Sequence, residues 1–297
     1  MIYHAPVDEE LASPPNMTST TRRQAVLRAA GVLAGLPHHA LAAAAEAATT
    51  PPRVECSFAV ATLRRGQLVE QPDGGGCRTS SGSDGIFQAA SLSRPVVATL
   101  ALRLALRGAL DLEQPLNEVL PDGYVHRQNL FALRERPVVD LVSPETLKKL
   151  TARKLLSHIG GLPNWSKNSP LQPFIEPVAR WRYSGEGYVL LQHVLEKLTE
   201  LPLNSLAASE LFEPLGMQGS AFKLTEHVSP SLVPGRAAAG QIRQLRFPYE
   251  IAASSLYTTA SDYGRFMAFT LGDQQLLKLI TESPRVSRRL RFWRMEP

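Results

Sequence analysis

The chain has 297 residues, of which 44% are hydrophobic and 20% charged, a composition typical of a globular protein with one large domain or two small ones. The net charge of +5 is concentrated at one end, because residues 285–297 carry five arginines and one acid whereas residues 48–284 carry only +2. The basic balance therefore does not indicate a nucleic-acid-binding protein. No apolar run reaches the ~18 residues needed to span a bilayer.

Residues 1–47 contain an arginine pair, Arg22 and Arg23, followed by an apolar stretch and an alanine-rich exit with Ala-x-Ala spacing. This pattern resembles a twin-arginine export signal, and it predicts a periplasmic or extracellular protein. The alternative is an amphipathic alanine-rich helix that stays on the protein. After export, Cys56 and Cys77 could pair in the oxidising compartment, although two buried free thiols are equally compatible with the sequence.

The first strands are predicted from Val54 onward. The segment VECSFAVATLRRGQLVEQ alternates on both sides of Gly66, which predicts two antiparallel strands joined by a hairpin. Residues 72–85 are rich in Gly, Ser and Asp and are expected to form a loop. An apolar-faced stretch then predicts a helix over 91–110, with Pro95 tolerated in its first turn.

Two more helices are predicted over 184–198 and 260–271, where apolar residues recur with helical periodicity. Proline-rich connectors separate these pieces, and the sequence holds no internal repeat and no heptad array. We interpret this order as an α-rich region inserted after an N-terminal pair of strands.

The start of the first helix, FQAASLSRPVVA, places Ser91 and Arg94 one helical turn apart on the same face. It resembles the Ser-x-x-Lys nucleophile motif of the serine β-lactamase and penicillin-binding-protein superfamily, with arginine in place of lysine. Because a guanidinium group stays protonated, Arg94 can stabilise an alkoxide but cannot accept a proton from Ser91. A literal Ser-x-x-Lys occurs from Ser220 to Lys223, but it lies in a Pro/Gly-bounded loop and is interpreted as a chance match.

Four further segments occur in the order and at about the spacing of that superfamily, and together they extend the resemblance over roughly residues 54 to 272. They are LTARKLLSHIGGLP, RYSGEGYVLLQHVLE, LFEPLGM and SSLYTTASDYGRFM. The chain is most similar to class C β-lactamases, DD-peptidases and class C-like esterases. The resemblance implies an α+β fold of the β-lactamase/DD-peptidase type, in which helices flank an antiparallel sheet and an all-α region is added.

The resemblance also assigns roles to individual residues. Ser91 would be the nucleophile, and its alternative role is that of a helix N-cap. Tyr183 matches the family tyrosine that accepts or relays the proton, with Arg94 as the neighbouring cation that a phenol needs to act as a base. Gly185 replaces a substrate-binding asparagine, which fits esters better than amides. His158 matches a packed structural histidine, and since no histidine has a partner at metal spacing, we predict neither a metal nor a cofactor.

A third family motif, Lys-Thr-Gly or His-x-Gly on a strand, is expected near the site, but nothing resembling it follows Asp262. We therefore expect the C-terminal strands to be missing. The predicted organisation is an N-terminal extension with the export signal (1–47), a truncated β-lactamase-like domain (48–284) and a basic tail outside the family (285–297).

The resemblance implies a serine hydrolase that acts on ester or β-lactam carbonyls through an acyl-enzyme at Ser91, impaired by Arg94 and by the absent third motif. Its substrate would be a small-molecule ester, a β-lactam or a peptidoglycan-like compound, with no nucleic-acid partner and no integral membrane span. The alternative is a non-catalytic homologue that at most binds a cell-wall fragment. The sequence does not define the oligomeric state.

Overall fold

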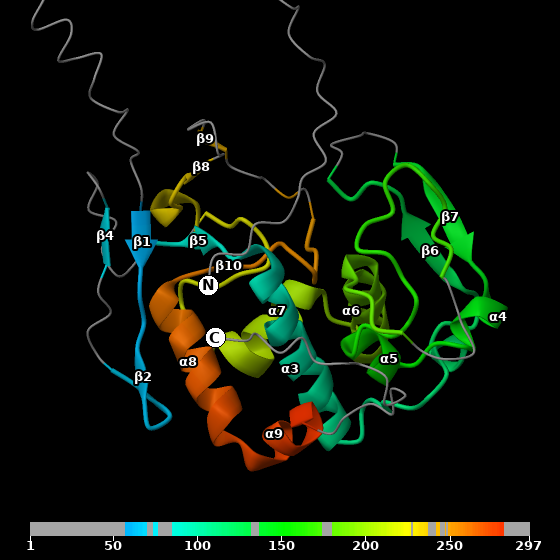
Figure 1. Ribbon diagram of the computed structural model, residues 1–297, viewed down its shortest axis with the longest axis horizontal. Helices are drawn as coiled ribbons and strands as arrows, with labels where there is room; N and C mark the ends of the chain where they lie inside the picture. The colour runs from blue at the N-terminus through cyan, green and yellow to red at the C-terminus, as the bar shows by residue number, and fades with distance from the viewer. Residues whose placement is uncertain are drawn as a thin grey trace, which may run out of the picture. The chain divides into compact units, whose positions relative to one another are not determined.

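The computed structural model (Figure 1) describes residues 57–69, 74–76, 85–131, 137–173, 180–226, 228–236, 242–243, 247 and 249–281. These residues all belong to one compact unit, Glu55–Pro297. The predicted export signal, Cys56, Cys77 and the basic tail lie outside the described residues, so those expectations remain predictions.

The first hairpin forms where the alternating pattern predicts it. β2 (Leu63–Arg64) pairs antiparallel with β3 (Gln67–Leu68). The two residues between them, Arg65 and Gly66, have positive φ angles of 53° and 79°. Both central residues of a two-residue hairpin turn need such angles to match the twist of the strands, which is why glycine is favoured there.

β1 (Ser57–Ala59) pairs antiparallel with β4 (Gly74–Gly76). The prediction of a loop over 72–85 was therefore wrong for these three glycines. Glycine has a low strand propensity because it has no side chain to pack, but its N–H and C=O groups can still pair with a neighbouring strand.

The remaining described strands also form antiparallel pairs. They are β5 (Phe87–Gln88) with β10 (Tyr257–Thr258), β6 (Tyr124–Arg127) with β7 (Val139–Val142), and β8 (Gly235–Arg236) with β9 (Ile242–Arg243). Since β5 and β10 are about 170 residues apart in the chain, their pairing joins two distant parts of the described fold.

The central helix is α3 (Ser93–Leu106), which is preceded by a tight 3-10 turn, η1 (Ala90–Leu92). The helix predicted over 91–110 thus begins as a 3-10 turn instead of an α-helix, and it ends four residues earlier than predicted. Gly108 follows its end with a φ of 73°, a left-handed conformation that commonly terminates a helix. α3 contacts α6, α7 and α9, so it occupies the middle of the core.

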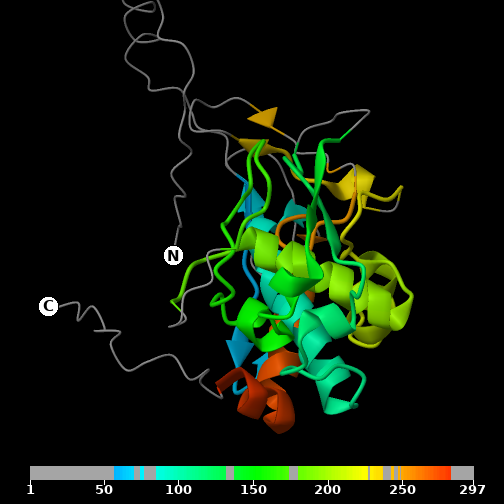
Figure 2. The same cartoon turned by 90° about the vertical axis from the view of Figure 1, so that its right-hand side faces the viewer.

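The helices around α3 include the two that helical periodicity predicts. The helical segments are α4 (Pro144–Leu147), α5 (Ala152–Leu156), α6 (Gly185–Thr199), α7 (Leu203–Ala207), α8 (Ala260–Gly272) and α9 (Gln274–Thr281), with short turns η2 (Leu116–Glu118), η3 (Ala208–Phe212) and η4 (Ser229–Ser231). In Figure 1, β1 and β2 lie on the opposite side of α3 from β6, β7 and α5, and Figure 2 views the molecule from the side of β6 and β7. Among the described residues, no helix is long and apolar enough to cross a membrane.

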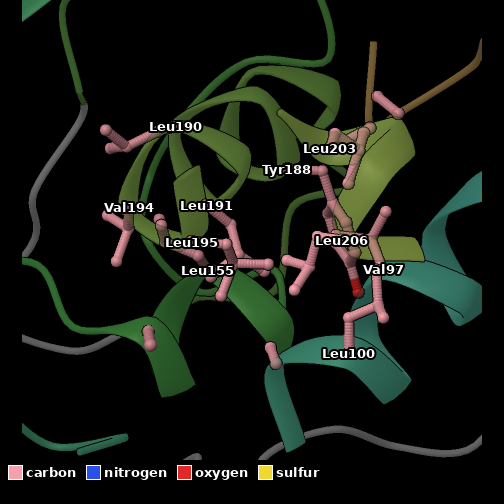
Figure 3. Close-up of a cluster of buried hydrophobic side chains, with 14 of the residues drawn as sticks. Val97, Leu100, Leu155, Tyr188, Leu190, Leu191, Val194, Leu195, Leu203 and Leu206 are labelled. Atoms are coloured by element: carbon pink, nitrogen blue, oxygen red, sulfur yellow. The ribbon is translucent and has the colours of Figure 1, made fainter. Parts of the chain in front are cut away.

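The core is formed where α3, α5, α6 and α7 meet (Figure 3). Its fully buried side chains include Val97, Leu100, Leu155, Leu190, Leu191, Val194, Leu195 and Leu203. The four from α6 are spaced i, i+1, i+4 and i+5, which is the apolar face that its periodicity predicts. Burial of each leucine or valine stabilises the fold by roughly 1.5–3 kcal/mol.

α8 begins with a cap and a buried carboxylate. The Thr259 hydroxyl accepts a hydrogen bond from the Asp262 N–H at 3.0 Å. The Asp262 carboxylate in turn accepts from the Gly219 N–H at 2.8 Å and from the Ser220 hydroxyl at 2.9 Å. Ser220 therefore has a structural role, and the interpretation of its Ser-x-x-Lys match as chance stays a prediction.

Replacing Thr259 with alanine should lower the free energy of unfolding by about 1 kcal/mol, the usual value of a threonine N-cap. Thr270→Ala is the matched control, because its hydroxyl bonds only to the Phe266 carbonyl of the same helix and its loss should change stability by less than about 0.5 kcal/mol. Urea unfolding of both variants checks the difference, and equal effects would contradict the capping role.

Candidate active site

Ser91 lies in the middle of η1, between β5 and α3, and its side chain is exposed. The preceding residue, Ala90, has a φ of 46°. Left-handed backbone costs a residue with a Cβ roughly 1–3 kcal/mol and persists only where the surroundings enforce it. The strained turn directs the chain from the strand into the helix and leaves the Ser91 hydroxyl at the surface.

The second serine of the motif, Ser93, is what holds this turn. Its side chain is fully buried, donates to the Ala90 carbonyl at 2.6 Å and accepts from the Leu256 N–H at 3.0 Å. Leu256 also accepts, through its carbonyl, from the Ala89 N–H at 2.8 Å. Ser93 thus ties the turn to the segment before β10.

No side chain caps η1 or α3. In the described part of the chain, Ser91 therefore does not fill the N-cap role that was its alternative. The structural work is done by Ser93, which the sequence analysis did not single out. The Ser91 hydroxyl remains available for chemistry.

Arg94 follows Ser91 by one turn and is 4% exposed. The carbon of its guanidinium group lies 4.0 Å from the centroid of the Tyr183 ring and 5.9 Å from that of Tyr188. One terminal nitrogen donates to Asn164 Oδ1 at 3.2 Å, whereas Nε and the other terminal nitrogen have no hydrogen-bond partner among the described residues. Burial lowers the pKa of Arg94, yet a guanidinium group remains cationic in any protein. The site therefore contains a permanent buried positive charge.

Tyr183 immediately precedes the Ser184 cap of α6 and is 37% exposed. The guanidinium group contacts its ring face, where the π electrons attract a cation. Its ring also packs against His158 and Trp181, with centroids 4.9 and 6.3 Å away. The structure thus brings Tyr183 against Arg94, which follows Ser91 by three residues.

His158 is a structural residue, as the sequence analysis predicts. Its Nδ1 accepts from the Ser184 N–H at 3.1 Å, and its carbonyl accepts from the Arg182 N–H at 2.7 Å. Burial, together with the charge of Arg94, lowers the pKa of His158 to about 4. The imidazole is therefore neutral at physiological pH, and its acceptor nitrogen is occupied by the backbone, so it is poorly suited to act as a general base.

Gly185 is the first residue of α6, and its N–H donates to the Asn164 carbonyl at 3.1 Å. A Cβ at this position would lie 2.5 Å from that carbonyl oxygen and 2.9 Å from the Trp165 ring. No side chain fits here unless the loop moves. A role of Gly185 in substrate binding stays a prediction.

Asn164 supplies the amide group that contacts Arg94, and the sequence analysis missed it. It follows the Gly-Leu-Pro turn in SHIGGLPNW, a position close to a recognised motif but without a signal of its own. Its partners are 70 and 21 residues away along the chain, so only the fold shows the contact. Among the described residues, no group of three His, Cys, Asp or Glu has the arrangement to hold a metal ion.

The arrangement contains an exposed hydroxyl, a buried cation one turn away and a partly exposed phenol stacked on that cation. An acyl-transfer site needs a nucleophile, a group that handles its proton and positive charge for the oxyanion. Ser91, Tyr183 and Arg94 supply one candidate for each of these roles.

Gly185→Ala should lower the free energy of unfolding by about 1–3 kcal/mol, because the added methyl group meets backbone and a packed aromatic ring. The control is Gly272→Ala at the end of α8, where an added Cβ meets no atom within 4 Å and should stabilise by about 0.4–1 kcal/mol. Thermal unfolding of the two variants should give shifts of opposite sign. A neutral Gly185→Ala would show that the loop at Asn164 adapts freely.

The chain is similar to known proteins over much of its length. The family model for Beta-lactamase matches residues 48–296. Penicillin-binding protein 4* of Bacillus subtilis (strain 168) is 27% identical over 157 residues, which cover 46% of this chain and 30% of that protein. Esterase EstB of Burkholderia gladioli is 28% identical over 172 residues, which cover 48% of this chain and 40% of that protein. The matched segments thus span less than half of either relative.

Among solved structures, the crystal structure of a class C beta lactamase superposes with a TM-score of 0.60 at 18% identity, covering 76% of this chain and 64% of that one. This similarity confirms the predicted β-lactamase/DD-peptidase-type fold. Because the family model matches most of its length, the chain belongs to the Beta-lactamase family.

Proposed function

We propose that the chain is a serine hydrolase of the β-lactamase and esterase type, with Ser91 as its nucleophile. The observation that carries this proposal is the buried Arg94 side chain, one turn from the exposed Ser91 and stacked on Tyr183 at 4.0 Å. A buried cation whose Nε and second terminal nitrogen have no hydrogen-bond partner within the described structure favours the appearance of negative charge beside it.

In the proposed reaction, Ser91 Oγ bonds to the carbonyl carbon of the substrate and gives up its proton through Tyr183. The ester C–O bond or the β-lactam C–N bond then breaks, and the leaving group takes that proton. Water attacks the acyl-enzyme, releases the acid and restores the Ser91 hydroxyl. Arg94 takes no proton in this scheme and acts only by its charge.

Esters with an apolar acyl group are the proposed substrates. Large side chains are exposed on the residue that follows Ser91 and on the segment that carries Tyr183, namely Leu92 (51%), Trp181 (57%) and Tyr183 (37%). Gly185 offers no side-chain hydrogen bond to an amide. Penicillin-binding protein 4* and esterase EstB, the two curated relatives, extend the proposal to β-lactam and peptidoglycan-like compounds. We also propose export of the protein, on the basis of the arginine pair at Arg22 and Arg23.

A non-catalytic homologue is the second candidate, and a specific observation favours it. Arg94 cannot accept the serine proton, and its stacking presents the face of the Tyr183 ring to the charge. If Tyr183 cannot relay the proton, the site binds a ligand without turning it over.

A fluorophosphonate probe separates the two candidates, because an activated serine displaces fluoride and forms a covalent phosphonate ester. We expect intact-mass and peptide analysis to show one adduct, located on Ser91, together with measurable hydrolysis of a chromogenic short-chain ester. Ser91→Ala should remove both signals, whereas Ser220→Ala, the serine of the other Ser-x-x-Lys sequence, should keep them. The absence of an adduct on folded protein would support the non-catalytic homologue.

Arg94→Lys tests how much of the activity the arginine suppresses. A lysine can lose its proton, and a positioned acid–base group is usually worth 10²–10⁴-fold. We expect a gain in ester hydrolysis below about tenfold, because lysine also loses the planar stack on Tyr183 and the contact with Asn164. An increase in ester hydrolysis of a hundredfold or more, measured by steady-state kinetics, would show that Arg94 is the main cause of low activity.

A further inference from the structure

The described residues include a buried ionic cluster that is centred on His126. The His126 imidazole is fully buried, with Nδ1 2.8 Å from Asp140 Oδ1 and Nε2 3.3 Å from Glu186 Oε2. His126 and Asp140 face each other across the β6–β7 pair, and Glu186 comes from the first turn of α6. Three segments of the chain thus meet at one imidazole ring.

The position of His126 between two carboxylates favours protons on both of its nitrogens, although Nε2 makes no hydrogen bond with any described residue. A neutral imidazole would direct a lone pair at one of the two carboxylates, and two buried acceptors in contact repel each other. Glu186 Oε2 makes no hydrogen bond with any described residue, so the charge of the imidazolium is what compensates it. Burial alone would lower the pKa of His126, but its hydrogen bond with Asp140 and the negative charges of Glu186 and Asp140 together raise it.

The other groups that face the cluster do not replace this cation. The Tyr124 ring lies 6.2 Å from the imidazole, and burial raises the pKa of that phenol, so it stays neutral. Gln128 donates to Asp140 Oδ1 at 3.1 Å without carrying charge. His193 packs against the Tyr124 ring rather than against the carboxylates, and burial lowers its pKa.

The cluster connects directly to the site through Glu186. Glu186 Oε1 accepts from the Ser166 N–H at 2.7 Å, and the Glu186 N–H donates to the Asn164 carbonyl at 3.2 Å. The side chain of Asn164 then contacts Arg94. Glu186 follows Tyr183 by three residues, so one carboxylate holds both segments that surround the buried cation.

We propose that protonated His126 is a positioning residue for the candidate site, because it holds Glu186 and thereby fixes the segment Asn164–Ser166 and the start of α6. This inference rests on the proposed function where it concerns catalysis. The part of the inference that concerns the position of Asn164–Ser166 rests on the fold alone.

The sign of the pH dependence follows from the cluster. Since the pKa of His126 is raised above its ordinary value of 6.5, its stabilising contribution is complete below pH 6.5 and is lost as the pH rises through the raised pKa. Hydrogen bonds from His126, Leu171 and Gln128 outweigh burial and hold the pKa of Asp140 below 3.8. The contribution of Asp140 is therefore present above pH 3.8 and is lost only as the pH falls below that value.

Glu186→Gln is the decisive variant. A glutamine can still accept from the Ser166 N–H, and its amide can donate to a neutral imidazole, so His126 no longer needs its second proton. His193→Gln is the matched control, because it removes a histidine that contacts the Tyr124 ring and neither carboxylate of the cluster.

Two quantities, the tryptophan emission and the rate of ester hydrolysis, are measured as a function of pH. In a background with Trp181→Phe and Trp293→Phe, Trp165 is the remaining tryptophan, and its emission reports on the segment that Glu186 holds. We expect an alkaline transition in this emission, with kcat/KM for the ester falling roughly ten- to a hundredfold over the same range, the cost of a small misplacement. His193→Gln should keep the transition, and Glu186→Gln should abolish it.

Each outcome either supports or overturns the positioning role of His126. Identical profiles for Glu186→Gln and the parent would overturn the inference. Absence of hydrolysis at every pH, with a Trp165 transition that Glu186→Gln removes, would support the positioning role and reject the proposed function. Should Glu186→Gln fail to fold, NMR titration of the His126 ring in the parent still decides, since a pKa at or below 6.5 would overturn the proposal.

Discussion

The contact between the Arg94 guanidinium group and the Tyr183 ring is the interaction on which the candidate site depends. A buried charge without a carboxylate is expensive, and here it is compensated by an aromatic face and one amide oxygen. Because these two partners come from different segments, the same charge joins α3, the entry to α6 and the loop that follows α5. Removing the ring or the amide would leave a buried cation with less compensation from its surroundings.

The nucleophile turn depends on a second long-range contact. Ser93 bonds to Leu256, and β5 pairs with β10, so the geometry of Ser91 is set by a segment more than 160 residues later in the chain. Of these two serines, Ser93 supports the turn and Ser91 is the candidate nucleophile. One hydroxyl is fully buried and satisfied, while the other is left at the surface.

Much of this fold is predictable from local patterns. α6 and α8 combine an apolar periodicity with a hydroxyl N-cap, and both were predicted within one residue of their ends. The pairing of the three glycines in β4 was missed because glycine favours loops until a partner strand binds its backbone. Ser91, Arg94 and Tyr183 were recognised through a family resemblance, whereas Asn164 and His126 belong to no motif. Their importance comes from contacts between distant segments, which no local pattern encodes.

The packing around Gly185 limits which substitutions this site can accept. Trp165 and the Asn164 carbonyl fill the space that a side chain at position 185 would need. A chain with a larger residue at this position would have to hold the loop differently, so glycine and the present loop depend on each other. A mutation that restores a side chain at 185 would meet a clash before it offered any benefit. A single substitution at position 185 is therefore disfavoured, and the backbone at Asn164 would have to move before a side chain could fit.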